Sequence, residues 1–269
     1  MGCRKLNHCV FEKTVQWETP SGKKVVQVWL SVDPMSDKYP SVSPYAYCGN
    51  NPIRITDPNG MEWEIDGICY TPGSNAPEGA AQSTKDKWNT MNNIYSTKNG
   101  KKAIDEMNKE GVLYKVSSET QVADAGGSYQ TNGDGTGGTI YLNGSDNNIS
   151  ALSHEMFHGY QDMNGQGGNS IHNEVEAYLF ENSVSTQYSY ANLVGSLGSS
   201  LKGEDPPHNH QVNKLTDDYS STTMNNVIFG FKQYSKANAN GIYTNYPLQR
   251  ENQKTDLIQN FYPLMPWKK

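Results

Sequence analysis

The chain has 269 residues, enough to bury a sizeable core in one large domain or two, and its hydrophobic content of 35% is typical of a polar, loop-rich protein. A formal net charge of −6 without a stripe of Lys and Arg argues against a nucleic-acid partner. No apolar run approaches the roughly 20 residues that a membrane helix needs, so no membrane span is expected.

The four cysteines lie in the first quarter of the chain and lack paired metal-ligand spacing. Free buried thiols are the expected state, and spacing alone does not support a disulfide between any two of Cys3, Cys9, Cys48 and Cys69. The first residues are followed by no apolar stretch, so a signal peptide is not expected.

Residues 29–60 are rich in turn-forming residues. Pro follows Asp at Asp33-Pro34 and at Asp57-Pro58, where the fixed φ of Pro and the hydrogen-bonding side chain of Asp favour a chain reversal. Aromatic residues stand between the turns and are expected to pack short strands. The segment is therefore predicted to be β structure with many turns.

The same run resembles the end of the rearrangement-hotspot (Rhs, or YD-repeat) associated core. In that family the core closes a β-cage of repeats, and a variable C-terminal segment, often a toxin, follows it. The resemblance implies that residues 1–60 are a remnant of such a core and that the rest of the chain is a toxin or effector. It further implies delivery from a bacterial cell as part of the longer polypeptide, and a cognate immunity protein as a partner. Self-cleaving members use paired Asp-Pro-x-Gly motifs, whereas this chain has one, at Asp57, so self-cleavage is not expected.

A stretch with Pro and Gly separates this segment from the rest of the chain. Residues 62–70 predict a strand, and residues 71–77 predict a connection because Pro and Gly interrupt any regular element. We therefore expect a linker at residues 61–77, between the remnant at residues 1–60 and a second domain at residues 78–269.

Hydrophobic spacing predicts the elements of the second domain. In chain order they are helices at 84–96 and 99–110, strands at 112–117 and 138–143, a helix around 150–160, further helices at 173–188 and 224–234, and a helical turn near residue 257. Six glycines fall within residues 124–138, which predicts a flexible hairpin or flap beside a cleft.

A His-Glu-x-x-His motif, formed by His154, Glu155 and His158, lies in the helix expected around residues 150–160. On an α-helix, positions i and i+4 lie on the same face, so both imidazoles can reach one metal ion. Zinc accepts such a pair, and the Glu between them is placed to take a proton from the attacking water. The motif therefore predicts a zinc site with Glu155 as general base.

The neighbouring residues favour a helix at this position. Either Asn148 or Ser150 can cap its start. Apolar residues at helical spacing would bury the side opposite the histidines, and they are Ile149, Leu152, Met156 and Tyr160.

A catalytic zinc ion usually has three protein ligands, so a third is expected after His158. The longer motif with a third His is excluded, because Gln161 and Asn164 occupy the positions that would need Gly and His. The remaining candidates are His172, Glu174, Glu176, Glu181, His208 and His210.

The segment after the motif resembles the gluzincin metallopeptidases, in which a Glu on the following helix completes the site in a Glu-x-x-Ala pattern. Glu174 matches that Glu, and Ala177 matches the Ala. The resemblance implies an α+β, zincin-like domain with a small mixed sheet, an edge strand, the active-site helix and the Glu-bearing helix. It also implies that an extended peptide binds along the edge strand, which here corresponds to Thr139, Ile140, Tyr141 and Leu142.

Helix phase bears on the choice between Glu174 and Glu176. Residues two apart on a helix differ in direction by about 200°, so both cannot face one ion. Glu174 shares its face with Ala177, Tyr178 and Glu181. We therefore favour Glu174 as the third ligand and keep Glu176 as the alternative.

Three side chains are candidates to stabilise the developing oxyanion, by proximity alone: Tyr160, His172 and Tyr178. Asp162, four residues after His158, is a candidate to orient an imidazole through a hydrogen bond. The expected function is a zinc-dependent endopeptidase that acts on a peptide or protein. Two alternatives stay open: an inactive binding or structural remnant of a truncated Rhs gene, and a zinc amidase that acts on cell-wall peptides.

Overall fold

The computed structural model describes residues 14–19, 22–27, 63–108, 112–117, 126–133, 135–142, 148–192, 209–237, 242–249 and 256–267. The chain divides into two compact units, the smaller of which is Arg4–Met61. In this unit the strands β1 (Thr14–Thr19) and β2 (Gly22–Gln27) form an antiparallel hairpin. The run that resembles the Rhs core, residues 29–60, lies outside the described residues.

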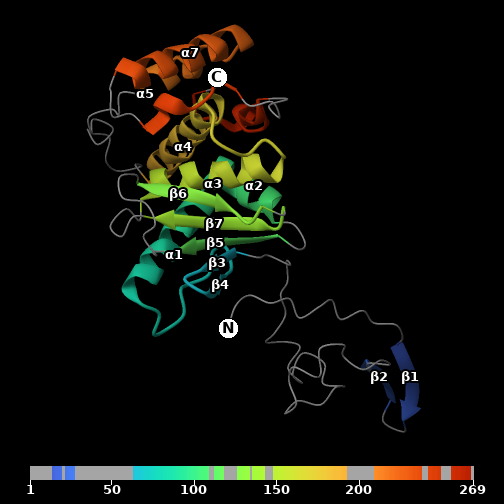
Figure 1. Cartoon of the computed structure of the whole chain (residues 1–269). Coiled ribbons are helices and arrows are strands. Elements are labelled where there is room, and N and C mark those ends of the chain that lie inside the picture. Colours follow the sequence, from blue (N-terminus) through green and yellow to red (C-terminus); the bar gives the residue numbers. More distant parts are fainter. Residues whose placement is uncertain are drawn as a thin grey trace. The chain divides into compact units, whose positions relative to one another are not determined.

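The larger unit contains a five-stranded mixed sheet in the order β4-β3-β5-β7-β6 (Figure 1). The strands β3, β5 and β7 are parallel, while β4 and β6 pair antiparallel with them at the two edges. Along β5, Tyr114 and Val116 are buried and Lys115 between them is exposed, so one face of the sheet packs on the core. The strands are β3 Trp63–Ile65, β4 Ile68–Tyr70, β5 Leu113–Ser117, β6 Gly127–Thr131 and β7 Gly137–Leu142.

The hairpin of β3 and β4 corrects the expected domain boundary. The linker expected at residues 61–77 contains two strands of the sheet, and Trp63 and Tyr70 are buried in its core. Trp63 pairs with Tyr114 of β5, which lies far along the chain, so the sequence near the hairpin gives no sign of this contact. The larger unit therefore begins at Glu62, ahead of the Pro- and Gly-containing stretch.

The edge strand beside the helix that carries the His-Glu-x-x-His motif is β6, and the expectation that residues 139–142 form the edge is wrong. Those residues belong to β7, which pairs with β5 on one side and with β6 on the other. The error arises because the glycine-rich residues 124–138, expected to be a flap, supply β6 as an additional strand. Among the described residues, β6 pairs only with β7, and its other side is therefore the free edge of the sheet.

Cys69 lies on β4, is exposed and is disulfide-bonded. The expectation of a free buried thiol is therefore wrong at this position. The other three cysteines lie outside the described residues.

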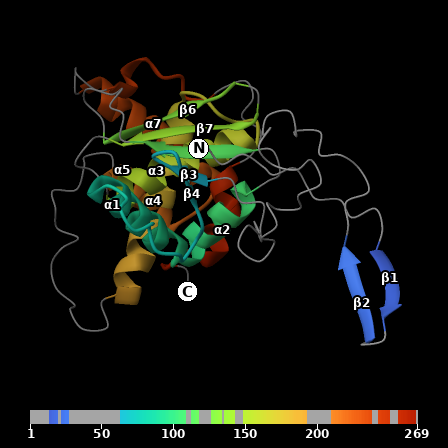
Figure 2. The same cartoon turned by 90° about the horizontal axis from the view of Figure 1, so that it is seen from below.

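Helices α1 and α3 pack against the sheet. In the view from below, α1, α2 and α4 lie on one side of the strands (Figure 2). Helix α3 runs beside β6 and β7, α4 packs against α3, and α7 packs on α4 (Figure 1). The helical elements are α1 Gln82–Tyr95, α2 Lys98–Met107, α3 Ile149–Met163, α4 Ile171–Asn192, α5 Asn209–Val212, α6 Lys214–Asp217, α7 Ser221–Ala237, η3 Ile242–Asn245, η4 Leu257–Asn260 and η5 Tyr262–Leu264.

Aromatic packing holds α3 alongside α4. The rings of Phe157 on α3 and Phe180 on α4 stack with their centroids 4.9 Å apart. Phe261, in the C-terminal segment, packs edge-on against both rings, at 5.8 Å and 5.1 Å. Because all three rings are fully buried, this cluster fixes the position of the polar face of α4 opposite the motif histidines.

Candidate metal centre

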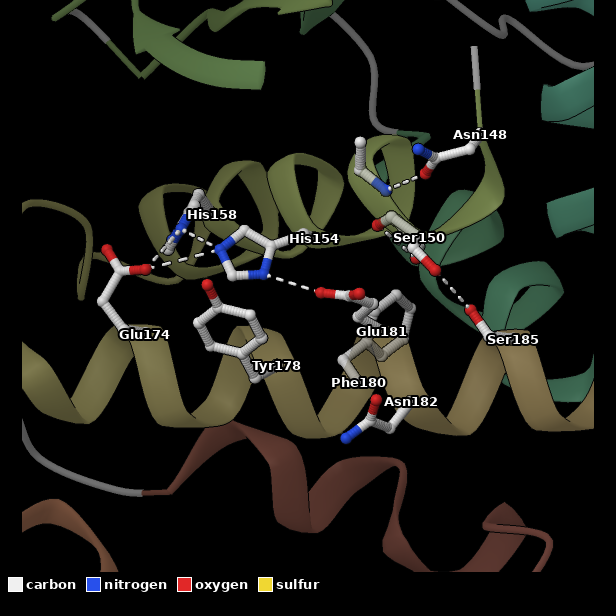
Figure 3. Close-up of polar contacts among 12 residues, drawn as sticks. Asn148, Ser150, His154, His158, Glu174, Tyr178, Phe180, Glu181, Asn182 and Ser185 are labelled. Atoms are coloured by element: carbon white, nitrogen blue, oxygen red, sulfur yellow. Dashed lines mark hydrogen bonds and ion pairs between the residues drawn. The ribbon is translucent and has the colours of Figure 1, made fainter. Parts of the chain in front are cut away.

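Helix α3 begins after Asn148, whose side chain accepts a hydrogen bond from the backbone N–H of Ala151 at 2.6 Å. Asn148, one of the two predicted candidates, therefore caps the start of this helix. The predicted apolar stripe is buried or partly buried against the core. The opposite face consequently presents His154 and His158 toward α4 (Figure 3).

Helix α4 supplies the residues that meet these histidines. Glu174, Tyr178 and Glu181 project from α4 toward the imidazoles (Figure 3). Their spacing of four and then three residues places them on one face of the helix. The structure thus brings the favoured third ligand to the motif.

Three donor atoms converge at this point. Nε2 of His154 and Nε2 of His158 are 3.2 Å apart, and Oε2 of Glu174 lies 3.4 Å from the first and 3.7 Å from the second. Tetrahedral ligands at about 2.0 Å from a zinc ion are about 3.3 Å apart, so the three atoms fit around one ion. Two imidazoles and one carboxylate also match the donor set of catalytic zinc sites, which keep a fourth position for water or substrate.

Neighbouring side chains fix the tautomers of both histidines. Nδ1 of His154 lies 3.1 Å from Oε2 of Glu181, which can only accept, so Nδ1 carries the proton. Nδ1 of His158 lies 2.9 Å from Oε1 of Gln161. The amide of Gln161 is oriented because its Nε2 donates to the carbonyl oxygen of Asn173 and to the Glu176 carboxylate. Both Nε2 atoms are therefore unprotonated in the neutral rings and free to bind a metal.

The electrostatics of the site favour a cation. Burial favours the neutral acid of Glu174, but the charge of His158 and hydrogen bonds from both imidazoles outweigh it and hold its pKa at about 2. Burial likewise opposes protonation of the two imidazoles, yet the Glu174 carboxylate raises the pKa of each, helped at His154 by Glu181. A metal ion bound by the two imidazoles would also stabilise the negative charge of the Glu174 carboxylate.

Glu155 lies between the face of α3 that carries the two motif histidines (Figure 3) and the edge strand β6. Its side chain is 8% exposed, and burial raises its pKa above the ordinary value for Glu. The backbone of Tyr129 on β6 lies near the Glu155 carboxylate and lowers its pKa, but this effect is smaller than that of burial. A Cβ atom at Gly127 would lie 2.9 Å from Cγ of Glu155, so glycine is what lets the strand approach this side chain.

Two of the three candidate oxyanion donors do not reach the site. The hydroxyl of Tyr160 donates to Glu106 of α2 at 2.7 Å, on the core side of α3. His172 pairs with Asp256 at 3.0 Å, away from the motif histidines. Tyr178 alone lies beside the site, where its ring packs edge-on against the first motif histidine with the centroids 4.5 Å apart.

Two further expectations are corrected. Asp162 accepts a hydrogen bond from the hydroxyl of Tyr129 at 2.9 Å and so holds β6 to α3, while Gln161 takes the role of orienting an imidazole. Glu176 points away from the histidines, because it is two residues beyond the metal-facing Glu on the same helix. Its oxygens accept hydrogen bonds from Gln161 Nε2 at 3.1 Å and from the backbone N–H of Ile258 at 3.0 Å.

Sequence reasoning missed the orienting roles of Glu181 and Gln161, although both share a helix face with a ligand. It also missed Tyr243, which follows no motif and reaches the site from a distant segment. The hydroxyl of Tyr243 lies 3.0 Å from that of Tyr178, which packs on the imidazole. His208 and the side chain of His210 lie outside the described residues.

Comparisons with protein-family models, curated proteins and solved structures found no significant match to this chain. Within the described part of the chain, no helix has both the length and the apolar character needed to cross a membrane. A functional assignment therefore depends on the geometry of the site itself.

Proposed function

We propose that the chain is a zinc-dependent endopeptidase in which His154, His158 and Glu174 hold the metal and Glu155 is the general base. The observation that carries this proposal is the convergence of three ligand atoms, 3.2 to 3.7 Å apart, beside a buried carboxylate that is not one of them. This is the arrangement that hydrolysis of an amide needs: a Lewis acid and a separate base.

When bound, zinc would polarise the scissile carbonyl and lower the pKa of the attacking water. Glu155 would take the proton of that water and pass it to the leaving amine. Burial raises the pKa of Glu155 above its ordinary value, which suits a group that must both accept and return a proton. The close approach of β6 at Gly127 holds the Glu155 side chain beside this strand.

A peptide substrate is favoured by the edge of the sheet. Among the described strands, β6 (Gly127–Thr131) pairs only with β7, and an extended peptide could add to the other side of such an edge as a further strand. Main-chain hydrogen bonds of this kind recognise a peptide of almost any sequence. We therefore assign the substrate as a peptide or unfolded protein segment.

The resemblance of residues 29–60 to the Rhs core supports a biological setting for this activity. In that setting the peptidase would be the C-terminal toxin or effector of a longer polypeptide delivered from a bacterial cell. An immunity protein would then be its partner.

The test is proteolysis by the zinc-loaded chain. A denatured bacterial proteome is incubated with the protein, and new N-termini are counted by mass spectrometry. Wild type should generate them, and Glu155→Gln should lose about 10²-fold or more of the activity while holding the same amount of zinc. Equal cleavage by both would show that another group is the base. A zinc-loaded wild type that cleaves nothing would favour the inactive remnant, and cleavage of cell-wall peptides alone would favour the amidase.

A further inference from the structure

A second cluster of metal-ligating side chains lies on the other side of α4. His172 and Glu176 are four residues apart on this helix, and Asp256 precedes η4 in the C-terminal segment. Nε2 of His172 lies 3.0 Å from Oδ1 of Asp256 and 3.7 Å from Oε1 of Glu176. All three ligand atoms lie within 4.8 Å of one another. The two separations from Nε2 resemble those at the first cluster and are close to the spacing of about 3.3 Å between ligands of one zinc ion.

The imidazole of His172 is held as a metal ligand would be. Its side chain is 2% exposed, and within the described part of the chain its Nε2 has no hydrogen-bond partner of good geometry. Nδ1 faces the side-chain amide of Gln249 at 3.5 Å, on the opposite side of the ring. Nε2 points at the oxygens of two carboxylates, the nearer of which is Oδ1 of Asp256.

The two carboxylates are oriented from outside the cluster. Glu176 is fully buried and accepts hydrogen bonds from the Ile258 N–H and from Gln161 Nε2. Nε2 of Gln259 donates to Oδ2 of Asp256 at 3.4 Å, which leaves Oδ1 facing His172. Such outer contacts are what fixes ligands around a metal.

We propose that His172, Glu176 and Asp256 form a second metal site, which takes a divalent cation of the zinc class. The charges balance: a neutral imidazole and two carboxylates compensate one divalent ion. Within the described residues, the ion pairs of both carboxylates are with His172 alone. His172 and Glu176 are buried and Asp256 is only partly exposed, so the ion serves the structure rather than a substrate.

The ion would fasten the C-terminal segment to α4. Asp256 leads directly into η4, and Phe261 just beyond it packs against Phe180 of α4. The second cluster is also connected to the first, because the Gln161 side chain is hydrogen-bonded both to Glu176 and to His158. This inference does not depend on the peptidase activity.

Metal stoichiometry tests it. The full chain is incubated with excess zinc, freed of loosely bound metal by gel filtration, and analysed by plasma mass spectrometry. Wild type should hold about two zinc ions, and the variants His172→Ala and Asp256→Ala about one. The double variant His154→Ala/His158→Ala, whose second cluster is intact, should also hold about one. No zinc in this double variant would overturn the proposal, because a protonated His172 would then be the cation of the cluster.

Thermal unfolding gives a second readout, and its first measurement leaves His172, Glu176 and Asp256 unchanged. Zinc at 100-fold above its dissociation constant should raise the Tm of His154→Ala/His158→Ala by about 5 to 10 °C. Adding Asp256→Ala to that variant should abolish the rise. An unchanged Tm in the double variant, or an equal rise with and without Asp256, would refute the site. Failure of the first cluster to bind zinc changes neither expectation, so the two proposals fail separately.

Discussion

Replacing Glu181 with Ala removes the carboxylate that accepts the hydrogen bond of His154 Nδ1 at 3.1 Å. That bond keeps the proton on Nδ1 and turns Nε2 toward the other ligand atoms, and without it the ring can rotate or change tautomer. Loss of such a contact typically weakens metal binding by about 10- to 100-fold, or about 1.4 to 2.7 kcal/mol. We expect the zinc affinity of Glu181→Ala to fall within this range.

The affinity is measured by competition with a chromophoric chelator, in the Asp256→Ala background so that metal at the second cluster is not counted. Glu181→Gln keeps an acceptor oxygen and should lose less. Glu78→Ala removes an exposed carboxylate outside the site and should bind zinc as before. Unchanged affinity in Glu181→Ala would refute the reasoning and show that ring packing by Tyr178 alone orients His154.

Three further changes separate the parts of the structure. Tyr160→Phe should keep zinc and turnover and lose about 1 kcal/mol of unfolding free energy in urea, because its hydroxyl is hydrogen-bonded away from the site; a large loss of turnover would return this residue to the site. Gly127→Val should lower turnover without changing zinc content, because its Cβ would meet the Glu155 side chain at 2.9 Å; normal turnover would mean that β6 does not position that base. The fragment 62–269 should fold and bind zinc, whereas 78–269, which lacks β3 and β4, should elute as an aggregate in size-exclusion chromatography. Equal folding of the two fragments would show that the β3–β4 hairpin is dispensable.

Spacing within single helices predicts much of the candidate site. The motif gives two histidines on one face of α3, and helix phase separates Glu174 from Glu176. The same reasoning extends to Glu181, seven residues after Glu174, and to Gln161, three residues after a motif histidine, because each shares a face with a ligand. Helix positions are also predicted to within a few residues, as the expected helix at 84–96 shows against α1.

Contacts between distant segments could not be predicted in this way. The pairing of Trp63 with Tyr114 makes the expected linker part of the sheet. The insertion of β6 beyond β7 depends on a register that the glycine-rich sequence does not reveal. Asp256 meets His172 only because the C-terminal segment returns to α4. Each of these outcomes is set by tertiary packing, which local propensity and periodicity do not encode.

Zinc-edge anomalous diffraction from crystals of the zinc-loaded Glu155→Gln variant tests the central claim most directly. A peak is predicted at about 2.0 to 2.2 Å from Nε2 of His154, Nε2 of His158 and a carboxylate oxygen of Glu174, with residue 155 outside bonding distance. The absence of a peak there, or a peak bonded to residue 155 in place of Glu174, would contradict the account.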